Sequence, residues 1–101
     1  MSKNHIKNSI RKSIEKDPLK SDIKKISLFG SHLDGKPRKD SDVDLLIEFA
    51  PKANIGFFRL VEIQQAFEKI LRKKVDLLTR EQLSKYFRKD VLQKAQTIYE
   101  K

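Results

Sequence analysis

The chain contains no cysteine, which excludes disulfide bonds and thiolate metal sites. It also has no long apolar run. The longest stretch free of Asp, Glu, Lys and Arg covers residues 26–33, far short of the ~18 residues that cross a bilayer. Residues 1–12 alternate lysines with single isoleucines and lack the apolar core of a secretion signal. From these absences we expect a protein of the cytoplasm.

Acidic residues are in the minority. Lys and Arg number 23 against 14 Asp and Glu, which gives a formal net charge of +9. Such a charge is typical of domains that bind nucleic acid through its phosphates, and this gives one hypothesis for the function. The basic residues are spread along the chain rather than clustered, so a solvated lysine-rich surface is the simpler explanation.

Apolar residues recur at helical spacing in three parts of the chain. Isoleucines at positions 6, 10 and 14 predict a first helix, which ends at Asp17 because the following Pro18 disfavours helical geometry there. Pro18 can then begin a short helix toward Ile23. A longer helix is predicted over residues 57–71. The apolar positions of a C-terminal helix are Phe87, Val91, Ala95 and Ile98.

Three strands are predicted between these helices, over residues 25–29, 43–49 and 74–78. The middle strand is the clearest, because its apolar and polar residues alternate between two faces. Thr79 follows the last strand and is placed to cap the next segment through a backbone N–H near Gln82. This order predicts one α/β domain over residues 1–101, with helices packed on a small sheet.

Asp42 and Asp44 stand at the start of the middle strand. Side chains at positions i and i+2 of a strand share a face, with Cα atoms about 6.5–7 Å apart, so the two carboxylates can converge on a cation. Magnesium prefers one or two carboxylates and keeps its other positions for water and substrate phosphates. Without a cation, two like charges ~4 Å apart repel by about 4 kcal/mol at an effective dielectric of ~20. We therefore predict a magnesium site here.

Asp76 is a third candidate, inside the strand over residues 74–78. If this strand neighbours the one over residues 43–49, Asp76 can join the other two carboxylates. Three carboxylates suit a two-metal site, which clamps the attacking and leaving oxygens of a phosphoryl displacement. Asp76 could also act as the base that takes the acceptor's proton.

Gly30 and Ser31 directly follow the first predicted strand, and ten residues separate Ser31 from Asp42. Glycine lets the backbone come close to a phosphate because it has no Cβ. Ser31 offers a hydroxyl donor, and free N–H groups at a following helix start would suit an anion. Arg38 and Lys39 in the spacer can meet the charge of a triphosphate or remain solvated.

These residues resemble a known signature, that of the DNA polymerase β-like nucleotidyltransferase superfamily. The matching segments are Leu28-Phe29-Gly30-Ser31 and Ser41-Asp42-Val43-Asp44-Leu45-Leu46. The whole chain resembles the minimal nucleotidyltransferase (MNT) branch, with coverage from about residue 23 to residue 99. The resemblance implies the polymerase β-like fold, a small mixed sheet flanked by helices. One departure is Asp34 before the second glycine, where family members often carry arginine.

The resemblance also implies residue roles and a partner. Asp42, Asp44 and Asp76 match the catalytic, metal-binding carboxylates, and Gly30 and Ser31 match the pair that contacts the nucleotide phosphates. Family members of this size are typically antitoxins encoded beside a HEPN-domain RNase toxin, and several transfer AMP from ATP to a tyrosine of that toxin. We therefore expect a magnesium-dependent nucleotidyltransferase that modifies a hydroxyl of a cognate HEPN toxin and releases pyrophosphate.

Two other functions stay open at this point. An antitoxin could neutralise its toxin by binding alone, through the amphipathic terminal helices, and would then not need Asp42 or Asp44. A basic nucleic-acid-binding module would instead show affinity for RNA or DNA that falls steeply with salt.

Overall fold

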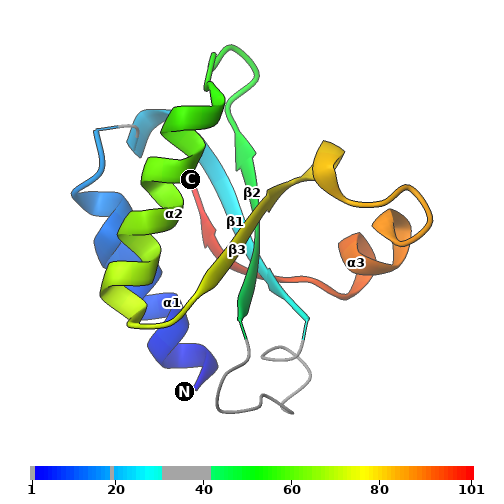
Figure 1. The fold of residues 1–101 in the computed structure, drawn as a ribbon, viewed down its shortest axis with the longest axis horizontal. Coiled ribbons are helices and arrows are strands. Elements are labelled where there is room, and N and C mark those ends of the chain that lie inside the picture. The colour runs from blue at the N-terminus through cyan, green and yellow to red at the C-terminus, as the bar shows by residue number, and fades with distance from the viewer. Residues whose placement is uncertain (1, 19, 31–41) are drawn as a thin grey trace.

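The computed structural model describes residues 2–18, 20–30 and 42–101, which form one sheet with helices on both faces (Figure 1). The helices are α1 (Lys3–Glu15), α2 (Phe57–Leu71) and α3 (Arg88–Lys94), with short 3₁₀ helices η1 (Lys20–Asp22) and η2 (Arg80–Gln82). The strands are β1 (Ile23–Phe29), β2 (Val43–Phe49), β3 (Val75–Thr79) and β4 (Gln96–Glu100). No helix of the described residues has the length and apolar character needed to cross a bilayer.

The sheet has the strand order β3-β2-β1-β4. β1 pairs antiparallel with both β2 and β4, whereas β2 and β3 run parallel. Parallel neighbours need a crossover connection, and α2 provides it between β2 and β3. The mixed sheet implied by the family resemblance is therefore confirmed.

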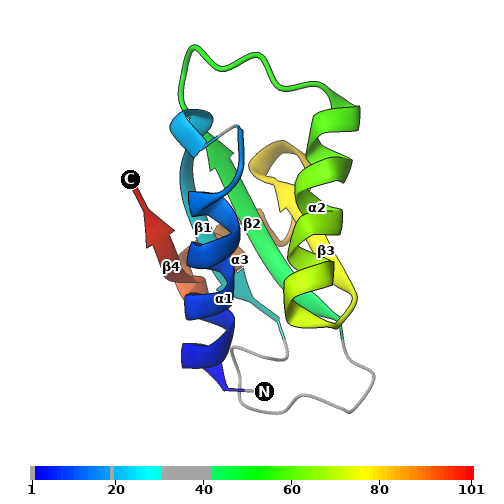
Figure 2. The same ribbon diagram turned by 90° about the vertical axis from the view of Figure 1, so that its left-hand side faces the viewer.

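The core lies between one face of the sheet and the two long helices. α1 and α2 lie side by side in front of the strands (Figure 2). Ile6, Ile10 and Ile14 of α1 are fully buried, as their spacing predicted. The strands contribute alternate residues to the same core: Ile26, Leu28, Val43, Leu45, Ile47, Val75, Leu77 and Ile98. Alternate burial leaves the other side chains of these strands on the opposite face, toward η2 and α3.

Most predicted elements are confirmed with small shifts at their ends. β2 and α2 have the predicted bounds, while β1 begins two residues early at Ile23. The short helix expected from Pro18 begins instead at Lys20. Thr79 and Gln82 form a capping box around η2, in which Gln82 Oε1 accepts a hydrogen bond from the Thr79 N–H at 2.8 Å.

The predicted C-terminal helix is wrong beyond Ala95. α3 ends at Lys94, and residues 96–100 form β4 along the outer edge of β1. Ile98 is buried, but as a strand residue, and Phe87 is 66% exposed rather than part of the core. An uncovered edge of β1 would leave its backbone N–H and C=O groups unpaired, and the β-branched residues of this segment fit a strand that pairs with them.

Candidate active site

Three aspartates occupy neighbouring positions on one face of the sheet. Val43 and Leu45 point into the core, so Asp42 and Asp44, which alternate with them, lie on the opposite face. β2 and β3 pair in a register that sets Asp44 directly beside Asp76. Neighbouring strands lie about 4.8 Å apart, so these two side chains start from adjacent backbone positions on the same face. The condition that made Asp76 a candidate, a strand next to β2, is met.

The start of β3 is fixed from two sides. The Val43 N–H donates to the carbonyl oxygen of Lys74 at 2.9 Å, which sets the register of β3 against β2. The Val75 N–H donates to Glu68 Oε2 of α2, also at 2.9 Å. Glu68 thus holds the backbone immediately before Asp76. Local sequence patterns do not predict this contact, because the bond joins two separate elements.

Asp44 is the carboxylate most affected by its surroundings. It is half-buried, as is Asp42, whereas Asp76 is exposed. Burial, and then the negative charges of Asp76 and Asp42, raise the pKa of Asp44 to about 6. Asp44 is therefore close enough to Asp76 and Asp42 to be repelled by their charges, which is unfavourable unless a cation or a proton lies beside it.

Gly30 lies against this cluster. β1 pairs with β2 so that Phe29 stands beside Asp44, and Gly30 follows with a φ of +79°. A Cβ at Gly30 would overlap the Asp44 carboxylate and lie 3.0 Å from its Cγ. The missing side chain therefore makes room for Asp44. Ser31 and the spacer residues Asp34, Arg38 and Lys39 lie outside the described residues.

The chemistry of these donors fits a hard cation. Carboxylate oxygens are what magnesium prefers, and one or two carboxylates are enough when substrate phosphates supply other ligands. Within the described parts of the chain, no group of three acidic, histidine or cysteine side chains forms a ready-made metal site. Asp42 and Asp44, two positions apart on one face, are thus the pair best suited to begin such a site.

Comparison with known proteins decides the family. A family model described as polymerase beta nucleotidyltransferase matches residues 8–101. The chain belongs to the polymerase β-like nucleotidyltransferases. The resemblance first noted in the Gly-Ser and Asp-x-Asp motifs is confirmed.

Two curated relatives from archaea extend this result. The nucleotidyltransferase is 31% identical over 70 residues to the protein adenylyltransferase MntA of Thermococcus cleftensis, with 69% of each chain covered. It is 37% identical over 81 residues to a Methanocaldococcus jannaschii protein provisionally named a protein adenylyltransferase, with 79% of each chain covered.

Solved structures share the fold. A toxin–antitoxin complex with AMP-PNP superposes with a TM-score of 0.74 at 22% identity, covering 94% of this nucleotidyltransferase and 73% of the other chain. A tri-AMPylated HEPN toxin in complex with its MNT antitoxin, from Shewanella oneidensis, gives a TM-score of 0.66 at 20% identity. That match covers 95% of this chain and 71% of the other. At these identities the likeness establishes the fold.

Proposed function

We propose that this nucleotidyltransferase is an antitoxin that transfers AMP from ATP to a tyrosine hydroxyl of a cognate HEPN toxin. The observation that carries the proposal is the cluster of Asp42, Asp44 and Asp76 on adjacent strands, with Gly30 directly against it. Relatives named protein adenylyltransferases and structural neighbours bound to HEPN toxins support the donor and the acceptor. A reaction that consumes ATP also fits the cytoplasmic location expected from the sequence.

In this proposal Asp42 and Asp44 hold magnesium, and Asp76 completes a two-ion site. When bound, the ions would supply positive charge that stabilises the triphosphate and the oxygens of the transfer. Gly30 and Ser31 would contact the nucleotide phosphates. Gly30 can take this role because its positive φ and its lack of a Cβ bring the backbone close to the cluster.

Asp76 is also the group best placed to act on the acceptor. It is the exposed member of the cluster, so a hydroxyl from another protein can reach it. Asp76 takes the proton of the tyrosine hydroxyl as its oxygen attacks the α-phosphorus of ATP. A new P–O bond joins the α-phosphorus to the tyrosine oxygen. The bond from the α-phosphorus to the oxygen that bridges to the β-phosphate breaks, and pyrophosphate leaves.

The test is AMP transfer to the cognate HEPN toxin. Wild type with ATP and magnesium should raise the intact mass of that protein by whole AMP units. The Asp42→Ala, Asp44→Ala double variant, or removal of magnesium with a chelator, should abolish the increase. Transfer by the folded double variant at the wild-type rate would contradict the proposed roles. Toxin neutralisation in cells that survives the double variant would favour the binding-only antitoxin.

The metal and nucleotide can be tested without a partner. Calorimetry should detect ATP binding that depends on magnesium in wild type and is lost in the double variant. Circular dichroism would show whether the variant is still folded. Equal binding with and without magnesium would overturn the assignment of the carboxylates as metal ligands.

A further inference from the structure

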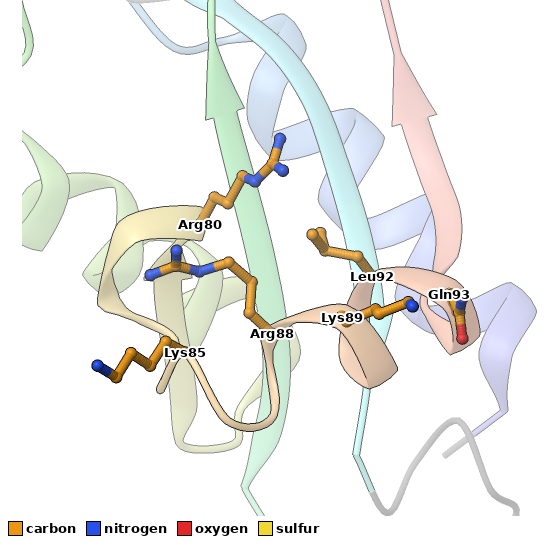
Figure 3. A pocket seen from close by; sticks show the side chains of 6 residues that line it. All are labelled: Arg80, Lys85, Arg88, Lys89, Leu92 and Gln93. Carbon is orange, nitrogen blue, oxygen red and sulfur yellow. The ribbon is translucent and has the colours of Figure 1, made fainter.

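A basic surface lies on the same side of the sheet as the three carboxylates. We define it by Arg80 of η2, Lys85 of the following turn, and Arg88 and Lys89 of α3 (Figure 3). Together with Leu92 and Gln93 these side chains line a hollow of about 350 Å³. In Figure 3 the hollow lies in front of the strands and α1 lies behind them.

The positive charge of this surface is not neutralised locally. None of its four cations forms an ion pair with a described carboxylate. The nearby Asp90 is already paired with Lys94 at 3.2 Å. Arg88 is held in place by its Nη2, which donates to the carbonyl oxygens of Glu81 and Leu83 at 3.3 and 3.1 Å. The exposed charges of Arg80, Lys85 and Lys89 are therefore available to an anionic partner, whereas Arg88 is engaged by the backbone.

Two exposed aromatic side chains adjoin these cations. Tyr86 and Phe87 lie in the turn between η2 and α3, and they are 82% and 66% exposed. Exposed aromatic residues beside arginines are enriched at the centres of protein–protein interfaces. This surface thus combines charge with apolar area, as a protein-binding site would.

The arrangement of the charges favours an extended ligand. In Figure 3 the amines of Lys85 and Lys89 point in opposite directions, so the cations do not converge on one small anion. A nucleic acid backbone that extended from here would also meet the negative charges of Asp42, Asp44 and Asp76. A protein segment can be acidic at the basic surface and uncharged at the carboxylates, so it fits both regions.

The distance to the carboxylates fits a short peptide. Arg80 is the member of the basic surface whose distance follows from the strand geometry. It comes four positions after Asp76, just past the end of β3, so a rise of ~3.3 Å per residue separates the two Cα atoms by about 13 Å. An extended acceptor segment covers the same distance with about four residues.

We propose that the basic surface docks an acidic segment of the protein acceptor, about four residues from the hydroxyl that is modified. This inference rests on the proposed transfer to a protein, and it adds the surface that selects the acceptor. Docking there would present the hydroxyl to Asp76. It would also favour acceptors that carry acidic residues at that spacing over other exposed tyrosines.

The test uses a synthetic peptide with one tyrosine, a neutral spacer of about four residues and four glutamates, and a matched peptide with glutamines. Each is titrated into the ¹⁵N-labelled chain without ATP or metal. The glutamate peptide should move the backbone amide signals of residues 80–93, and the glutamine peptide should not. The Lys85→Glu, Lys89→Glu variant should bind the glutamate peptide roughly tenfold more weakly, because each attraction becomes a repulsion.

The matched control is Lys3→Glu, Lys12→Glu, which makes the same charge change on α1. It should keep its affinity within about twofold of wild type, because α1 lies across the sheet from the basic surface. Equal weakening in both variants, or signal changes spread over α1, would overturn the proposal. So would a ten-nucleotide RNA that binds residues 80–93 more tightly than the glutamate peptide, which would make this surface a nucleic-acid interface.

Peptide binding, followed by the amide signals, is measured without the transfer reaction. The Asp42→Ala, Asp44→Ala variant should bind the glutamate peptide at least as tightly as wild type does, because it loses two negative charges and no cation of the basic surface. A chain that binds the peptide but transfers no AMP would contradict the proposed function alone. A chain that modifies the toxin but does not bind the peptide at residues 80–93 would contradict the docking proposal alone.

Discussion

At Asp44, the arrangement proposed to bind a cation destabilises the metal-free fold. Its pKa is raised to about 6, first by burial and then by the charges of Asp76 and Asp42. The unfolded chain has a lower value for this residue, about 3.9. Protonated Asp44 therefore stabilises the folded state. That contribution is complete below the unfolded pKa and is lost as the pH rises through about 6.

We expect Asp44→Asn to stabilise the metal-free protein at pH 7.5. The full shift would correspond to about 3 kcal/mol, but Asp44 is half-exposed and solvent screening reduces it, so a gain of about 1 kcal/mol is expected. Near pH 4 the variant and wild type should differ little. Urea unfolding at both pH values measures this, with Glu15→Gln on α1 as the control. A variant less stable than wild type at pH 7.5 would contradict the argument.

Gly30 is a second residue where the site constrains the backbone. Gly30→Ala places a Cβ onto the Asp44 carboxylate and strains a φ of +79°, a conformation that costs an L-residue roughly 1–2 kcal/mol. We expect a loss of stability of that size and weaker magnesium-dependent ATP binding. Gly56→Ala is the matched control, because a Cβ there has no neighbour within 4 Å. Equal effects of the two substitutions on ATP binding would show that Gly30 has no special place in the site.

At the scale of elements, the sequence predicted what local patterns determine. β2 and α2 were found from the alternation and the helical spacing of their own residues. The end of the chain was missed because Val91, Ala95 and Ile98 also fit helical spacing. What decides between helix and strand there is the open edge of β1, which is distant in the sequence and cannot be read from a local window.

The same limit applies to the candidate site. The spacing of Asp42 and Asp44 within one strand was enough to place them on one face. The position of Asp76 depends on the register between β2 and β3, so the sequence could state it only as a condition. The basic surface was missed, since Arg80, Lys85 and Arg88 look scattered until η2 and α3 bring them together.

The role of β4 can be tested at Ile98. Ile98→Ala removes a buried side chain that strand pairing places in the core, and we expect a loss of about 2–4 kcal/mol in unfolding free energy. Thr97→Ala on the exposed face of the same strand should cost less than about 1 kcal/mol. Urea unfolding of the two variants measures the difference. Similar small losses would mean that the C-terminal segment does not pack as a strand on this core.

At the scale of the whole molecule, the candidate site lies on one face of the sheet and the core on the other. α1 and α2 supply the buried contacts, so the opposite face can hold charged groups without disturbing them. That face contains both the three carboxylates and the basic surface. Carboxylates and cations on one face agree with the proposal that the cations attract an acceptor whose hydroxyl is modified at the carboxylates.

The net charge of +9 has a consequence for the stability of the whole fold. Repulsion acts across the molecule when the Debye length, about 30 Å at 0.01 M salt, exceeds its radius of gyration of 12.8 Å. At 0.1 M the Debye length falls to about 10 Å, so most of this repulsion is screened. Among the attractive interactions that salt weakens in return are the exposed pairs Arg59–Glu62 and Lys94–Asp90, and such surface pairs contribute little.

We therefore expect the unfolding free energy to rise as NaCl increases from 0.01 to 0.1 M, because more repulsion than attraction is removed. Urea unfolding at constant pH measures this slope. The Lys3→Gln, Lys12→Gln variant carries two fewer charges and should show a shallower slope than wild type. If the unfolding free energy rose with sodium sulfate but not with NaCl at equal ionic strength, this would point to specific anion binding at the basic surface instead. Stability that falls with NaCl would show that attractive pairs outweigh the net charge.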